Sequence, residues 1–189
     1  PPDSGVTYYW QTEATRGEQS TGAGNGPRSF TLNASVPTSL RGVVLRASLA
    51  GSPEPQEGRL LVATDAAPAT GRDGVLRGAL AFNGTSTKLI YDAPRFPLRT
   101  YTFAAWFCPE GLKEDGRRWH QIVSAWFAPV NDPLRVAIQD RELVVSIEQP
   151  GGGSRLSAVR VENRRWYHVA VVKKFTELSM YVNGKQVGE

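Results

Sequence analysis

The sequence has a single cysteine, Cys108, and no long apolar run. One cysteine cannot form an internal disulfide, so the fold has to be held together by packing alone. Cys108 stands in an apolar stretch, and we expect it to be a small buried side chain and not a reactive thiol. No apolar run reaches the roughly 18 residues that a membrane-spanning helix needs, so the sequence predicts no membrane span.

Helical periodicity is nearly absent, and apolar residues alternate with polar ones instead. In LRVAIQ, for example, Leu134, Val136 and Ile138 fall on one face of an extended chain. Clusters rich in glycine and proline, such as GSPEPQEG and QPGGGS, separate these alternating stretches. Many short strands with such turns between them predict an all-β sandwich or barrel.

The first 39 residues differ from the rest of the chain. They contain two candidate strands, GVTYYWQT and FTLNASV, around the stretch RGEQSTGAGNGPRS, whose composition is typical of a mobile loop. We therefore expect a partly flexible N-terminal arm over residues 1–39 and a main domain over residues 40–189. Because the chain starts with Pro1 and not with methionine, we also expect a processed or excised piece of a longer protein.

The charge balance does not indicate a nucleic-acid partner. The net charge is +4 at pH 7, but the basic residues are spread along the chain. No basic helix and no aromatic-rich RNA-binding motif accompanies them. We interpret most of them as residues of solvated loops.

No set of residues has the pattern of a catalytic site. Asp140 and Glu142 fall on one face of an extended chain, but they lie between two predicted strands, where a solvated turn is expected. His120 and His168 are far apart and belong to no cluster with metal-ligand spacing. The sequence therefore predicts a protein that is not an enzyme. A further hypothesis, ranked after the two given below, is an unusual glycoside hydrolase that uses Asp140 or Glu142.

Five stretches, in their order along the chain, resemble the laminin-G-like jelly roll, a branch of the concanavalin A-like lectin/glucanase superfamily. They are RGVVLRASLAG, GVLRGALAFNGTSTKLIY, LRTYTFAAWFCPEG, HQIVSAWF and WYHVAVVKKFTELSMYVNGKQV. The resemblance covers roughly residues 40–189 and implies an antiparallel two-sheet β-sandwich. Asn183 and Gly184 predict a type I′ hairpin turn. The strands that follow this turn in the family are missing here, so we expect a jelly roll that lacks its closing C-terminal strands.

Two predicted strands, YTFAAWF and WYHVAVV, are apolar on both faces, and we expect them in the middle of stacked sheets. A large indole opposite small alanine side chains is a common way for two sheets to interdigitate. We therefore expect Phe103, Trp106 and Trp166 to be packing residues.

The resemblance also implies a function. It suggests a non-catalytic recognition module of a larger extracytoplasmic protein, whether secreted, periplasmic or at the cell surface, that binds a carbohydrate or a protein surface. The alternative is a structural or assembly domain whose open sheet edge pairs with another chain or segment.

Jelly-roll modules of this kind bind ligands through loops at one rim or through a sheet face. Sugar sites combine an aromatic platform with polar groups that satisfy hydroxyls. The predicted ligand-binding residues are Arg117, Arg118, Trp119, Asn131 and Asp132. Relatives often carry Ca²⁺ in loops, and the oxygen donors of Asn131 and Asp132 make them the candidate calcium ligands, although the same pair before a proline also suits an ordinary turn. No other cofactor is expected.

Overall fold

A computed structural model shows an all-β protein and describes most of the chain from residue 42 on. The described residues are 7–10, 13–16, 19–22, 28–31, 42–93, 96–112, 119–125, 131–149 and 152–188. Side chains are described from residue 42 on, except those of Gln149 and Ala158. The chain divides into two compact units, Pro1–Val43 and Val44–Glu189, which are considered separately.

The N-terminal unit contains two antiparallel strand pairs. Strand β1 (Thr7–Trp10) pairs with β4 (Arg28–Thr31), and β2 (Glu13–Arg16) pairs with β3 (Gln19–Gly22). The predicted loop, RGEQSTGAGNGPRS, is therefore wrong at Arg16, at Gln19–Gly22 and at residues 28–29, which belong to strands.

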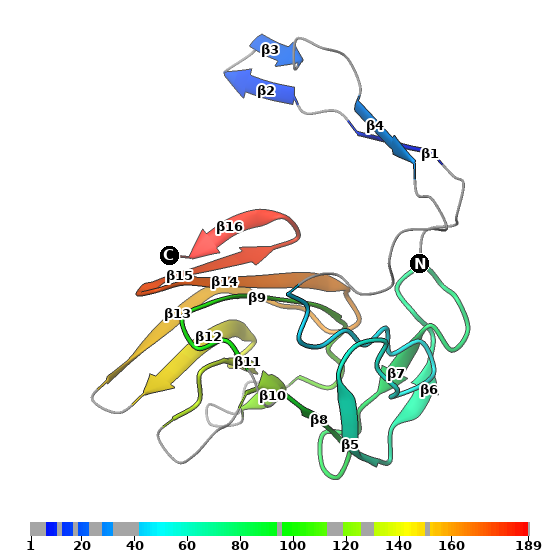
Figure 1. The fold of residues 1–189 in the computed structure, drawn as a ribbon. Helices are drawn as coiled ribbons and strands as arrows, with labels where there is room; N and C mark the ends of the chain where they lie inside the picture. The colour runs from blue at the N-terminus through cyan, green and yellow to red at the C-terminus, as the bar shows by residue number, and fades with distance from the viewer. Residues whose placement is uncertain are drawn as a thin grey trace. The chain divides into compact units, whose positions relative to one another are not determined.

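The second unit is built on two four-stranded antiparallel sheets. The meander sheet has the order β10 (His120–Ser124), β11 (Arg135–Gln139), β12 (Glu142–Gln149) and β13 (Gly152–Arg160). The second sheet, called the β14 sheet, has the order β16 (Lys185–Gly188), β15 (Glu177–Val182), β14 (Tyr167–Lys174) and β9 (Thr100–Phe107). The two sheets lie one above the other, and β13 contacts β15 and β16 (Figure 1).

The hydrophobic core lies between these sheets, and the predicted alternation places it there. Val136 and Ile138 of β11 face inward, as predicted, and both are buried. On β14, Val169 and Val171 point into the same core. Complete burial of one such aliphatic side chain stabilises the fold by about 1.5–3 kcal/mol relative to its exposed state. A β-sandwich with an apolar interior is therefore confirmed.

Two hairpin turns follow from the residues at their tips. Asn183 and Gly184 have φ angles of 49° and 79°, which fits the predicted type I′ turn between β15 and β16. Asp140 and Arg141 have φ angles of 51° and 65° and connect β11 to β12. Asp140 thus lies in a hairpin turn, as predicted.

The segment 42–93 is organised differently. Strand β5 (Arg59–Thr64) pairs with β8 (Lys88–Asp92), and β6 (Ala67–Ala69) pairs with β7 (Ala79–Ala81), so each makes a two-stranded sheet beside the sandwich (Figure 1). No side chain of residues 42–93 belongs to the described core cluster. Seven of its large apolar side chains are exposed, namely Leu45, Leu61, Val62, Val75, Leu76, Phe82 and Ile90.

Three expectations about packing are wrong. The stretch YTFAAWF was expected in the middle of stacked sheets, but β9 is an edge strand of the β14 sheet and its outer face is exposed. Trp106 was expected in the interior, but it points to the outer face of the β14 sheet and is 49% exposed. Cys108 was expected to be buried, but it is exposed just beyond the end of β9. Partial burial, with a smaller effect of the Glu110 carboxylate, raises the pKa of its thiol. Phe103 does pack against the core, and Trp166 is half-buried.

Candidate ligand-binding site

The outer face of the β14 sheet carries an aromatic pair. Strands β9 and β14 place Trp106 directly opposite His168. Their ring centroids lie 5.0 Å apart, with an angle of 52° between the ring planes. Because Val169 and Val171 face the core, His168 has to face outward, and the antiparallel register turns Trp106 to the same side. The indole is held by a rigid strand and still reaches solvent.

The Asn183–Gly184 turn closes one side of this pair. The Oδ1 atom of Asn183 accepts a hydrogen bond of 2.9 Å from the backbone N–H of His168. The backbone N–H of Asn183 donates a second bond of 2.9 Å to the His168 carbonyl oxygen. These two bonds fix the turn against β14. Together they help to form a shallow open pocket of about 490 Å³, lined by Trp106, Arg165, Trp166, His168, Asn183 and Gly184.

Two guanidinium groups lie at this pocket. Arg72, from the loop between β6 and β7, lies with its Cζ atom 4.4 Å from the Trp106 ring centroid. Arg165 lines the pocket and pairs with Glu162 at 3.3 Å, while Arg72 pairs with Asp73 at 3.0 Å. All four charged side chains are substantially exposed. Exposed ion pairs contribute only about 0–1 kcal/mol, so a ligand could recruit these arginines at small cost.

Trp119, the aromatic residue of the predicted loop site, lies next to the meander sheet. Its side chain is 40% exposed, and its ring is 5.8 Å from the guanidinium carbon of Arg135 and 5.2 Å from that of Arg155. The guanidinium of Arg155 also donates a hydrogen bond of 2.7 Å to Gln139. Trp119 is therefore a second partly exposed indole with cations around it.

The other predicted loop residues are placed differently from Trp119. Arg117 and Arg118 lie outside the described residues. Asn131 is half-buried, and Asp132 has no accessible surface. The Oδ2 atom of Asp132 accepts hydrogen bonds from Ser124 Oγ at 2.7 Å and from Arg135 Nε at 3.1 Å. The carboxylate of Asp132 is thus committed to internal contacts.

The calcium prediction can be compared with this environment. A protein-bound Ca²⁺ ion takes about six to eight oxygen ligands. The Oδ1 atom of Asp132 is buried without a hydrogen-bond partner, which favours an additional cation or donor, but Arg135 already neutralises the carboxylate. No group of three or more His, Cys, Asp or Glu side chains is gathered among the described residues. These residues do not by themselves form a calcium site, and calcium at Asn131 and Asp132 stays a prediction.

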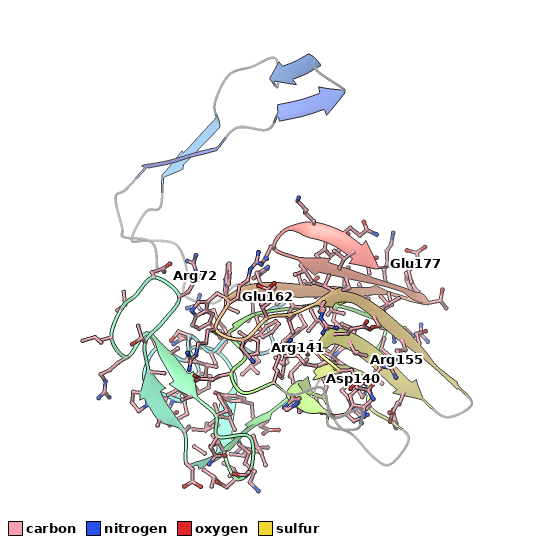
Figure 2. The ribbon with its side chains drawn as sticks, turned by 180° about the vertical axis from the view of Figure 1, so that it is seen from behind. Arg72, Asp140, Arg141, Arg155, Glu162 and Glu177 are labelled. Carbon is pink, nitrogen blue, oxygen red and sulfur yellow. The ribbon has the colours of Figure 1, made fainter. Side chains whose placement is uncertain are left out.

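The candidate catalytic groups remain dispersed in the folded chain. Asp140 is in the exposed β11–β12 turn, away from Arg72 and Glu162 (Figure 2). The side chain of Glu142 accepts a hydrogen bond of 2.6 Å from Ser157 on the next strand.

No helix in the described part of the chain is long and apolar enough to cross a membrane.

The fold and the arrangement of its strands define an antiparallel two-sheet β-sandwich. A family model of the laminin G type, described as the concanavalin A-like lectin/glucanases superfamily, matches residues 82–189. This match covers more than half of the chain, and the chain belongs to that superfamily. The resemblance and the expected all-β two-sheet sandwich are thereby confirmed, while the expected lack of closing C-terminal strands stays a prediction. Neither the curated proteins nor the solved structures contain a match.

Sequence reasoning missed the pocket around Trp106. One signal was present: Thr100 and Thr102 have the same phase along β9 as Trp106, and two threonines in an otherwise apolar strand mark its outer face. Arg72 could not have been found in this way. It is more than thirty residues away in sequence, and only the folded chain brings it to the indole.

Proposed function

We propose that this chain is a non-catalytic recognition module that binds carbohydrate through the outer face of the β14 sheet. The observation that carries the proposal is the half-exposed indole of Trp106 in a pocket with His168, Asn183 and Arg165. A flat aromatic face can stack on the C–H groups of a sugar ring, and the surrounding amide, imidazole and guanidinium groups can satisfy its hydroxyls.

Membership of a superfamily named for lectins and glucanases supports the same ligand class. This support is an analogy at the level of the fold, so the site residues carry the specific claim. The proposal includes an extracytoplasmic location, which fractionation of the source cells would test. Recovery of the protein only from the cytoplasm would contradict that part.

The loop residues of the sequence prediction offer a second candidate surface, centred on Trp119. A glycan array with the immobilised chain should identify a saturable sugar ligand. Titration calorimetry should then compare Trp106→Ala with Trp119→Ala. Each variant removes one partly exposed indole, from the β14 sheet and from beside the meander sheet respectively. We expect Trp106→Ala to weaken binding at least about tenfold, equivalent to about 1.4 kcal/mol, and Trp119→Ala to leave it nearly unchanged.

The reverse pattern would move the site to the Trp119 loop. Absence of binding to every sugar on the array would contradict carbohydrate recognition. An assembly role is the second function that the geometry supports, because seven large apolar side chains of the segment 42–93 are exposed. Chromatography with in-line light scattering would show that role as a stable complex.

A further inference from the structure

Strand β9 is an edge strand of the β14 sheet, and it lacks the features that usually protect edge strands from pairing with further strands. Among the described residues its only strand partner is β14. It has eight residues, TYTFAAWF, with no charge, no proline and no glycine. Natural outer strands are usually short, charged or bulged, because their free backbone groups otherwise recruit further strands.

The other three outer strands of the two sheets have such protection. Strand β16 has only four residues and begins with Lys185. Strand β13 carries Arg155 and Arg160, and the pairing of β10 with β11 contains a bulge. The difference singles out β9 as an edge that is built to accept a strand.

The core is also open along β9. The inward-facing residues of β14, for example Val169 and Val171, are fully buried. On β9, the inward-facing Tyr101 is buried, but Phe103, Ala105 and Phe107 are only partly buried, although they pack against the core. A strand added at this edge would therefore cover apolar surface as well as pair with backbone groups.

We propose that the partner of β9 is the same strand of a second copy, paired antiparallel about a two-fold axis at Ala104. In this register Phe103 lies opposite Ala105, a large side chain facing a small one on the core side. On the outer face Trp106 lies opposite Thr102. No charged residue of β9 faces its equivalent, so the strand is complementary to itself.

The residues that flank β9 favour the same antiparallel pairing. Arg99 precedes the strand and Glu110 lies just beyond its other end, and both are exposed. Antiparallel pairing brings Arg99 of one copy near Glu110 of the other, so opposite charges meet at both ends of the paired strands. Glu110 already pairs with Arg164 at 3.1 Å, but both side chains are largely exposed, so Arg99 can join this pair. The dimer would join the β14 sheet of one copy to the β14 sheet of the other, which makes one continuous sheet. Both Trp106 side chains would then lie on the same face, where one glycan chain could engage both.

Sedimentation velocity over a concentration series tests this inference, which concerns the sheet edge and is independent of sugar binding. The wild-type chain should show a reversible dimer. Ala104→Lys should raise the dimer dissociation constant at least about tenfold, because it places like charges opposite each other at the axis. Ala104→Glu should do the same, and an equimolar mixture of the two variants should dimerise again. Ala104 is exposed, so neither change disturbs the core.

Ser179→Lys is the matched control, since Ser179 lies on the same outer face but on the interior strand β15. It should leave the dimer unchanged. A wild-type chain that stays monomeric at the highest soluble concentration would overturn the proposal. A dimer that resists Ala104→Lys, or two variants that do not recover association on mixing, would overturn it as well.

Discussion

The two parts of the larger unit, residues 44–93 and residues 100–188, are both made of antiparallel strands but differ in what those strands bury. The later segment has four-stranded sheets whose inward residues form the core. The earlier segment has two-stranded pairs that leave Leu61 and Ile90 exposed. Isolated two-stranded pairs are marginally stable, so the comparison teaches that stacking of longer sheets, and not strand formation, creates the stability of this fold.

The two segments also divide the site between them. The later segment provides the rigid platform of Trp106 and His168, held in register by β9 and β14. The earlier segment provides Arg72 from a loop, next to that platform. A rigid scaffold with adjustable loop residues is a common arrangement in recognition proteins.

The largest expected contrast comes from removing a leucine from each part. Leu143 has no exposed surface, so Leu143→Ala should lower the free energy of unfolding by about 3–4 kcal/mol through lost burial and a residual cavity. Leu61 is 49% exposed, and Leu61→Ala should change that free energy by about 0.5 kcal/mol or less. Urea denaturation of both variants measures the difference. Equal losses would show that residues 44–93 share the core.

A second contrast compares two carboxylates with arginine partners. Asp132 is completely buried and accepts hydrogen bonds from Arg135 and Ser124. Asp132→Ala should cost about 2–3 kcal/mol, because Arg135 Nε and the Ser124 hydroxyl lose their acceptor, although Arg135 keeps its pair with Glu148. Asp92 pairs with a largely exposed Arg59, and Asp92→Ala should cost at most about 1 kcal/mol. Thermal unfolding followed by circular dichroism would compare the stability of the two variants. A larger loss of stability for Asp92→Ala than for Asp132→Ala would contradict this prediction.

A smaller effect is expected at alkaline pH from Tyr101, at the start of β9. Its hydroxyl donates a hydrogen bond of 2.6 Å to the Pro133 carbonyl, and burial, with a smaller effect of Asp132, raises its pKa above the ordinary value of 10.0. The unfolded chain therefore releases this proton first as pH rises. The stabilisation should be complete below pH 10 and decline above it.

The Tyr101→Phe variant isolates this effect. It should lose about 1 kcal/mol at neutral pH, from the missing hydrogen bond, and should show a weaker decline in stability above pH 10. Tyr181→Phe, on the outer face of β15, is the control. An unchanged alkaline decline in the Tyr101→Phe variant would exclude Tyr101 as the responsible group.

The sequence predicted the architecture well where alternation was strict. Leu134, Val136 and Ile138 share one phase, with Arg135 and Gln139 in the other, and this phase places them in the core. It failed at Trp106, because only two threonines, Thr100 and Thr102, mark the outer face of an otherwise apolar strand. It also failed at Cys108, which lies just past the strand end, where alternation no longer fixes burial.

The candidate site was less predictable than the fold. A polar residue next to a proline suggests a turn, and nothing in that pattern showed that Asp132 would be enclosed by Ser124 and Arg135. The pocket depends on the cross-strand pair of Trp106 and His168, which follows from strand register, while Arg72 reaches the indole from a loop of another strand pair. Register is a property of the assembled sheets and not of a local pattern.

Hydrogen–deuterium exchange of the intact chain, read out by mass spectrometry, tests the central claim most directly. If the stability lies in the two stacked sheets, amides of β11, β12, β14 and β15 should exchange slowly and together, by global unfolding. Amides of β5, β6, β7 and β8 should exchange much faster, by local opening. Equal and slow exchange in both segments would contradict the account, because it would place residues 44–93 in the same cooperative core.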